Sequence, residues 1–212
     1  MNEPAVTLTD YGLALECAVL VVLLVQQAGG DVALRRWFQL LFGSLGLAAL
    51  AGGTVHGFVT DMASLPGRLL WALTLLAIGL TALATWATGA HLLDSLRAEQ
   101  TIVSAAIMSF VGYAAIALLV IQAFWVAMAY YLPAAMFLLV MLTRAYVRFP
   151  DRALVMGIIG LLLTIVAAGI QRAGIPLYPV YFNYNALYHA LQAVAVILVF
   201  LTARRLANRD ER

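Results

Sequence analysis

Long apolar runs separated by short polar stretches dominate this 212-residue chain. A helix that spans a membrane needs about 20 mostly apolar residues, and seven segments meet that requirement. One uncharged stretch, residues 101–143, is roughly twice as long as one span requires, so we divide it near Gln122 to Trp125. The predicted spans are residues 9–27, 37–59, 67–93, 101–121, 125–146, 151–171 and 183–203.

Composition supports the same class of protein. The chain is 65% apolar and 10% charged, whereas soluble domains carry about a quarter charged residues. The residues before the first apolar run are acidic or neutral, as at Glu3, so this run is predicted to be a retained helix rather than a signal peptide. The single cysteine, Cys17, offers no disulfide framework, and a net charge of +2 does not suggest a nucleic-acid partner. We therefore predict one all-α domain, an integral membrane bundle of seven transmembrane helices in contact with membrane lipids.

The basic residues predict the orientation of this bundle. All twelve are arginines, and alternation of the seven spans puts ten of them on one side of the membrane. Only Arg68 and Arg172 fall on the other side. Because basic residues concentrate in cytoplasmic loops, we expect the N-terminus outside and the C-terminus in the cytoplasm.

Polar side chains inside the predicted spans are candidates for function, because they are costly in lipid. His91 falls near the cytoplasmic side, but the others gather in the outer half of the first, second, sixth and seventh spans. In the seventh span, Asn185, His189 and Gln192 are spaced i, i+4 and i+7, which places them on one helical face. The outer layer is predicted to contain Asp10, Glu16, Thr54, His56, Asp61, Gln171, Arg172, Asn183, Tyr184, Asn185, His189 and Gln192.

The polar residues also allow simpler structural roles, and other classes of membrane protein can be considered. A single buried histidine more often makes an interhelical hydrogen bond than holds a ligand, and Asp10 could cap the first helix. A retinal protein needs a Schiff-base lysine, and the chain has none. Haem would need a facing pair such as His56 and His189, but we do not expect haem, because such pairs recur as interhelical contacts. The polar groups form one layer rather than a path, which argues against an ion or proton transporter.

Two stretches carry a resemblance to known proteins. Residues 52–58 (GGTVHGF) and 182–189 (FNYNALYH) resemble a family of bacterial seven-helix proteins that is in turn similar to the alkaline ceramidase and adiponectin/progestin receptor superfamily. The resemblance implies a zinc site with ligands at His56 and His189, and with a third at Asn185 or, by the bacterial spacing, Tyr184. It implies hydrolysis of a lipid amide, with Asp61, Asp10 or Glu16 as base and Thr54 as the nearest hydroxyl.

Two functions follow from these observations, both for a multi-pass protein of the bacterial inner membrane. The first is a zinc-dependent hydrolase of a lipid amide or ester. The second is a non-catalytic protein that binds or senses a lipid or other small ligand in a degenerate metal site. In the second case the outer polar layer forms the pocket, to which Thr54, Gln171, Asn183, Tyr184 and Gln192 contribute.

Overall fold

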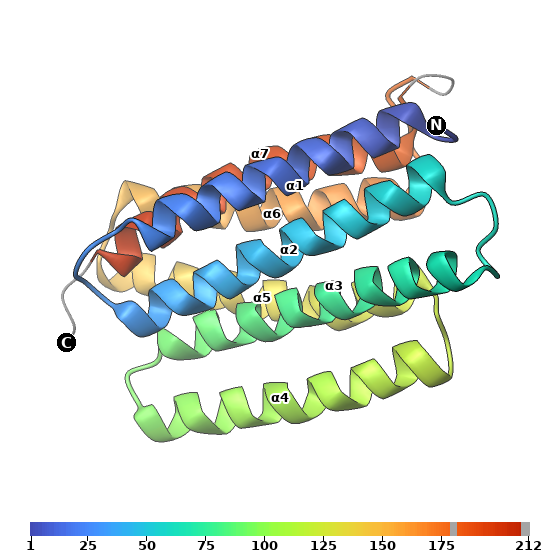
Figure 1. Ribbon diagram of the computed structural model, residues 1–212. Helices are drawn as coiled ribbons and strands as arrows, with labels where there is room; N and C mark the ends of the chain where they lie inside the picture. The colour runs from blue at the N-terminus through green and yellow to red at the C-terminus, as the bar shows by residue number, and fades with distance from the viewer. Residues whose placement is uncertain (179–181, 209–212) are drawn as a thin grey trace.

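A computed structural model describes residues 1–178 and 182–208 and shows an all-α bundle (Figure 1). The expectation of seven helices is confirmed, and each helix is long and apolar enough to cross a membrane. The part of the chain that the structure describes contains no strand, only an isolated bridge between Tyr178 and Phe182. The helices are α1 (Pro4–Val25), α2 (Val32–Phe58), α3 (Leu65–His91), α4 (Leu96–Leu119), α5 (Phe124–Arg148), α6 (Arg152–Ala173) and α7 (Tyr184–Ala207).

Local sequence explains where several helices begin. The side chain of Asp31 accepts a hydrogen bond from the Leu34 amide, and Ser64, Ser95, Asp151 and Asn183 cap α3, α4, α6 and α7 in the same manner. Helix α1 begins earlier than residue 9, because Pro4 occupies the first turn, where its missing amide hydrogen costs nothing. The uncharged stretch 101–143 is broken after Leu119 and resumes at Phe124, near the predicted turn.

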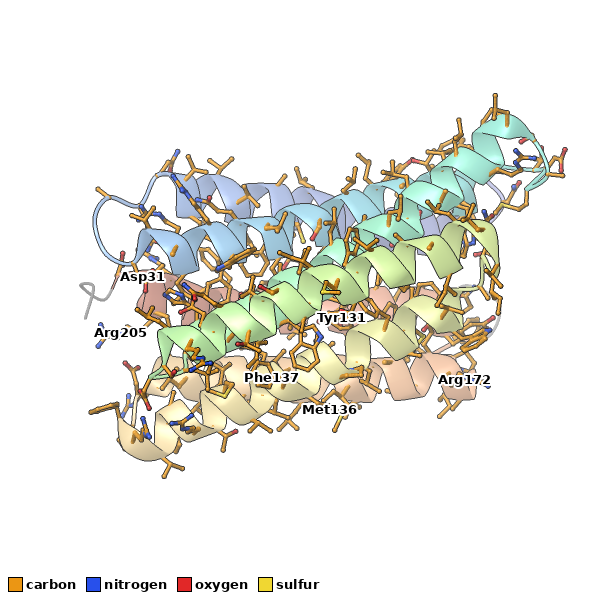
Figure 2. The ribbon with its side chains drawn as sticks, turned by 90° about the horizontal axis from the view of Figure 1, so that it is seen from below. Asp31, Tyr131, Met136, Phe137, Arg172 and Arg205 are labelled. Atoms are coloured by element: carbon orange, nitrogen blue, oxygen red, sulfur yellow. The ribbon has the colours of Figure 1, made fainter. Side chains whose placement is uncertain are left out.

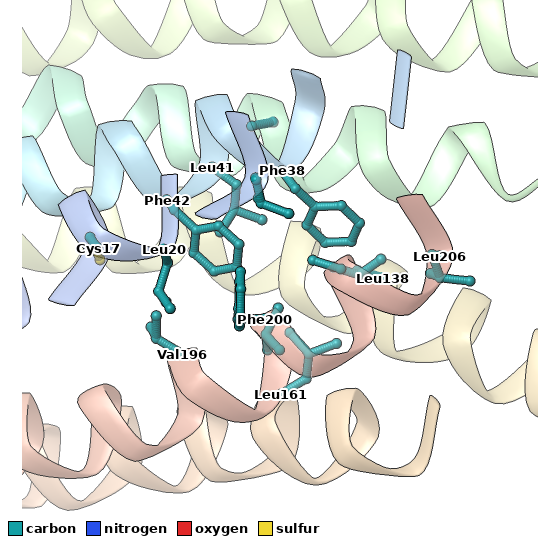
Figure 3. Close-up of a cluster of buried hydrophobic side chains, with 14 of the residues drawn as sticks. Cys17, Leu20, Phe38, Leu41, Phe42, Leu138, Leu161, Val196, Phe200 and Leu206 are labelled. Atoms are coloured by element: carbon teal, nitrogen blue, oxygen red, sulfur yellow. The ribbon is translucent and has the colours of Figure 1, made fainter. Parts of the chain in front are cut away.

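Packing is uneven around the bundle. Helix α2 packs along both α1 and α3, and α7 packs along α6 and α1. Helix α4 lies at the edge, against α3, and touches α5 only slightly (Figure 1). The largest buried cluster joins α1, α2, α5, α6 and α7 around Phe38, Phe42, Leu138, Leu161 and Phe200 (Figure 3).

The two ends of the bundle differ in chemistry. The start of α1 and the end of α7 lie at opposite ends of the bundle, here called the N-terminal and C-terminal ends, and α1, α3, α5 and α7 all begin at the N-terminal end (Figure 1). The described arginines at helix ends or in loops of the C-terminal end are Arg35, Arg36, Arg97, Arg144, Arg148, Arg152, Arg204 and Arg205. Arg172 lies at the opposite end from Asp31 and Arg205 (Figure 2).

Candidate functional site

A cavity of about 630 Å³ opens at the N-terminal end of the bundle. Its polar lining comes from the last turns of α2 and α6 and the first turns of α7. Its apolar lining comes from the N-terminal parts of α3 and α5, and α3 also contributes the hydroxyl-bearing Thr74. The lining residues are His56, Trp71, Thr74, Phe124, Trp125, Met128, Gln171, Arg172, Ala173, Gly174, Tyr184, Asn185 and His189.

Each of the two histidines in this cavity pairs with one acidic side chain from the N-terminal segment. The side chain of His189 is only 11% exposed, and its Nε2 lies 3.3 Å from Oδ1 of Asp10 on α1. His56 is more accessible, and its Nδ1 lies 2.8 Å from Oε2 of Glu3, the residue that precedes α1. The second carboxylate oxygen of Asp10 and Nδ1 of His189 are buried and have no hydrogen-bond partner among the described residues. The two pairs therefore leave unused hydrogen-bonding capacity at the site.

Glycines in α2 bring α1 close enough for these pairs to form. A Cβ atom at Gly53 would lie 2.7 Å from Cβ of Asp10, and one at Gly57 would lie 2.8 Å from Cγ2 of Thr7. Beside this contact, the hydroxyls of Tyr11 and Thr54 are 3.1 Å apart. Small residues are the usual means by which membrane helices approach closely. Gly53 and Gly57 therefore allow the close approach of α1 that places Asp10 beside the cavity.

Amide side chains connect α6 to α7 on another side of the cavity. Nε2 of Gln171 donates to Oδ1 of Asn185 over 3.1 Å, and Oε1 of Gln171 is buried without a described partner. Asn183 accepts hydrogen bonds from the Asn185 and Ala186 amides, so it caps α7. Tyr184 contributes to the cavity lining.

Six of the predicted site residues lie outside the cavity lining: Asp10, Thr54 and Asn183, whose contacts are given above, and Asp61, Glu16 and Gln192. Asp61 is exposed in the loop after α2, where it accepts a hydrogen bond from the Ala63 amide. Glu16 lies six residues beyond Asp10 in α1, about 9 Å further along the helix axis. Gln192 is one turn deeper than His189 and lines a second, smaller cavity.

The expected zinc ligands share the cavity but do not form a metal site. His56, His189 and Asn185 all line it. Within residues 1–178 and 182–208, however, no group of three His, Cys, Asp or Glu side chains is placed to hold a metal ion. Each histidine is paired with a different carboxylate, and the oxygen of Asn185 accepts from Gln171. The described side chains, as arranged, do not fit a zinc ion.

Several cavity residues did not emerge as candidates from the sequence. Trp71, Phe124, Trp125 and Met128 form an apolar wall, and Trp71 also donates its indole N–H to the carbonyl of Gln122 over 2.8 Å. Aromatic residues near span ends are ordinarily assigned to the membrane interface, which hides such a wall. Glu3 lies before the first apolar run, and only its pairing with His56 indicates a role.

The fold and the cavity define a multi-pass, all-α membrane protein with a polar pocket at one end of its bundle. The chain belongs to a family of unknown function (DUF6962), whose model matches residues 5–208. No curated protein and no solved structure matches the chain. The family match does not link the chain to the alkaline ceramidase and adiponectin/progestin receptor superfamily, so that resemblance stays a prediction.

Proposed function

We propose that this protein binds an amphipathic small molecule or lipid in the cavity at the N-terminal end of the bundle. The observation that carries the proposal is the division of the cavity into two walls. Trp71, Phe124, Trp125 and Met128 offer apolar surface, whereas His56, His189, Gln171 and Asn185 offer hydrogen bonds. A volume of about 630 Å³ falls within the range of small-molecule sites, about 300–1,000 Å³.

The distribution of arginines supports an orientation for this cavity. Eight described arginines lie at the C-terminal end of the bundle, and Arg68 and Arg172 lie at the cavity end. By the positive-inside rule, the cavity faces outward and the C-terminus is cytoplasmic. In a bacterial inner membrane, the ligand would then enter from the periplasmic side or from the outer leaflet.

The unpaired atoms at the polar wall indicate what the ligand supplies. Oε1 of Gln171, whose side chain lines the cavity, is a hydrogen-bond acceptor without a described partner. The second oxygen of Asp10, which contacts the lining residue His189, is another when it is ionised. A buried acceptor left without a partner costs about 1–3 kcal/mol. A ligand that carries hydroxyl or N–H donors on its polar end would satisfy these groups.

Ligand-induced stabilisation tests the proposal. The probes are oleate, lysophosphatidylcholine and N-oleoylethanolamine, which carry anionic, zwitterionic and neutral amide head groups. A probe present at about 100 times its Kd stabilises a protein by about 2.7 kcal/mol. Thermal unfolding in detergent can be followed by the reaction of a fluorogenic maleimide with Cys17, because this thiol is fully buried and is the only one in the chain.

A matched pair of variants assigns the stabilisation to the cavity. Met128→Trp adds bulk to the apolar wall and is expected to abolish it. Met108→Trp makes the same change at a residue on α4 that is 76% exposed, and it should retain the full effect. The proposal is wrong if no probe raises the melting temperature, or if both variants respond as the wild type does.

The second candidate function is a metal-dependent hydrolase of a lipid amide or ester. One observation favours it, since both histidines line the same cavity. Among the probes, N-oleoylethanolamine is itself a lipid amide, and its hydrolysis would release oleate. Mass spectrometry of the product and metal analysis of the purified protein test this candidate. Absence of stoichiometric zinc, together with unchanged stability of His56→Ala, would reject it.

A further inference from the structure

A second set of buried polar side chains lies deeper in the bundle, where the ligand cavity does not reach. Its members are hydroxyls and one amide that are at most 5% exposed. They are Ser44, Thr81, Thr85, Thr88, Thr164 and Gln192. Polar groups at this depth are costly unless they have partners, so their shared location calls for an explanation.

Four helices bring part of this set to a small internal cavity. The cavity has a volume of about 20 Å³, and its polar lining comprises Thr85 on α3, Tyr131 on α5, Thr164 on α6 and Gln192 on α7. A volume of about 10–15 Å³ holds one water molecule, provided that two to four polar groups surround it. Gln192 is 2% exposed, and its Oε1 has no hydrogen-bond partner among the described residues. A water molecule in this cavity would satisfy that oxygen.

On the side of the ligand cavity, α7 connects the two sites. Gln192 follows His189 by three residues, which is about 4.5 Å along the helix axis. His189 in turn contacts Asp10, whose second oxygen lacks a described partner. About one turn of α7 therefore separates the contact between His189 and Asp10 from the internal cavity.

On the other side, α3 continues the series to the C-terminal end of the bundle. Thr85, Thr88 and His91 follow one another at three-residue intervals, again about 4.5 Å each. The Thr85 hydroxyl donates to the carbonyl of Thr81 over 2.7 Å, which leaves its oxygen able to accept a proton. The hydroxyl of Thr88 is buried and has no partner in the described part of the chain.

His91 ends the series between two carboxylates. Its Nδ1 lies 2.6 Å from Oε1 of Glu99, and its Nε2 lies 2.8 Å from Oδ2 of Asp31. Asp31 marks the end of the bundle opposite Arg172, and Tyr131 lies between these two ends (Figure 2). Polar groups on α1, α7 and α3 thus extend from Asp10 near one end of the bundle to His91 near the other.

We propose that a series of polar side chains, completed by water in the internal cavity, conducts protons between the ligand cavity and the opposite face of the membrane. The series consists of Asp10, His189, Gln192, Thr85, Thr88 and His91. In each step an oxygen or nitrogen accepts a proton from one neighbour and releases a proton to the next. One O–H or N–H bond forms as another breaks, so that one proton crosses and no group changes its oxidation state. The sequence suggested a single polar layer, because the hydroxyls of Thr85, Thr88 and Thr164 were not among the polar groups considered there.

Proton flux into liposomes tests the path without any ligand. The full chain is reconstituted into liposomes that contain the pH-sensitive dye pyranine, with potassium and valinomycin to clamp the membrane potential. An imposed pH gradient should collapse faster than in protein-free liposomes. Thr85→Val and Gln192→Leu remove polar atoms of the internal cavity and should slow protein-dependent flux about tenfold or more, the effect of a barrier higher by about 1.4 kcal/mol.

Two further variants distinguish loss of the proton path from a general disturbance of helix packing. Thr85→Ser keeps the hydroxyl and should retain most of the flux. Thr202→Val makes the same change as Thr85→Val at a fully buried threonine that bonds the carbonyl of Ala153 and does not line the internal cavity, so flux should persist. Labelling of Cys17 verifies that each variant is folded. Wild-type flux equal to that of protein-free liposomes overturns the proposal, as does wild-type flux in folded Thr85→Val or Gln192→Leu.

Discussion

The contact between α1 and α2 beside the candidate site gives a sharp test of how the site is positioned. Gly52 and Gly53 are neighbours in α2 and differ in what a methyl group would meet. At Gly53, an added Cβ would lie 2.7 Å from Cβ of Asp10 and 3.1 Å from the Tyr11 ring. At Gly52, the nearest atoms are Cγ2 of Thr74 at 3.6 Å and Oδ2 of Asp10 at 3.9 Å, which are ordinary contacts. Only Gly53→Ala therefore requires α1 to move.

The expected difference in stability follows from this comparison. Both substitutions gain about 1 kcal/mol of helix propensity, so this term cancels between the two variants. Overpacking a closely packed core costs about 1–3 kcal/mol. We expect Gly53→Ala to be less stable than Gly52→Ala by about 1–3 kcal/mol, because Cβ of Asp10 is fixed by the backbone and cannot swing aside. Displacement of α1 should also weaken the contact of Asp10 with His189.

Labelling of Cys17 during heating measures this difference. For a chain of this size, each 1 kcal/mol shifts the melting temperature by roughly 2–4 °C. Gly43→Ala is a control on the same helix, since the nearest atom to its added methyl would be Cγ2 of Val21 at 4.0 Å. Equal melting temperatures for Gly53→Ala and Gly52→Ala would refute the close packing of α1 on α2 at this site.

Three further predictions concern the remainder of the bundle. His91→Leu leaves the carboxylates of Asp31 and Glu99 without their shared partner, and should cost about 1.5–3 kcal/mol, the range for a hydrogen bond to a charged group. Arg205→Ala, which breaks an exposed ion pair with Asp151, should cost less than about 1 kcal/mol, and a larger loss than for His91→Leu would contradict this ranking. Tyr113→Phe removes the buried bond from α4 to the carbonyl of Leu75 and should cost about 1 kcal/mol. An unchanged melting temperature for Tyr113→Phe would show that this bond does not hold α4.

The helices could be predicted because lipid imposes a length and a composition on each of them. The break between α4 and α5 could be located only approximately, since Leu119, Val120 and Ile121 are as apolar as the helices on either side. Helix α1 begins at Pro4, before the predicted span, because it continues through Asp10, the charged residue that interrupts the apolar run. Hydropathy alone does not detect a helix that extends beyond its apolar run.

Part of the candidate site could be predicted from the depth of the polar residues along their predicted membrane spans. His56, His189, Asn185, Gln171 and Tyr184 come from three helices, and all line the cavity. Depth alone does not determine the direction in which a side chain points. Glu16 and Gln192 lie deeper in their helices than the cavity lining, and Asp61 is exposed in the loop after α2. Pairing across helices, as between Glu3 and His56, depends on the rotation of α1 about its axis, which no local pattern specifies.

The two walls of the ligand cavity are held in different ways, and this difference bears on how the site selects a ligand. Glycine contacts fix α1 against α2, and interhelical pairs then hold His189 by Asp10 and Gln171 by Asn185. The apolar wall has one such anchor, the bond from Trp71 to the carbonyl of Gln122, in the linker that precedes α5. Fixed polar groups lose little freedom on binding and therefore discriminate between head groups, whereas apolar contacts are not directional. We therefore expect the polar wall to select the head group of the ligand by hydrogen bonds. The apolar wall should accept apolar parts of different shapes.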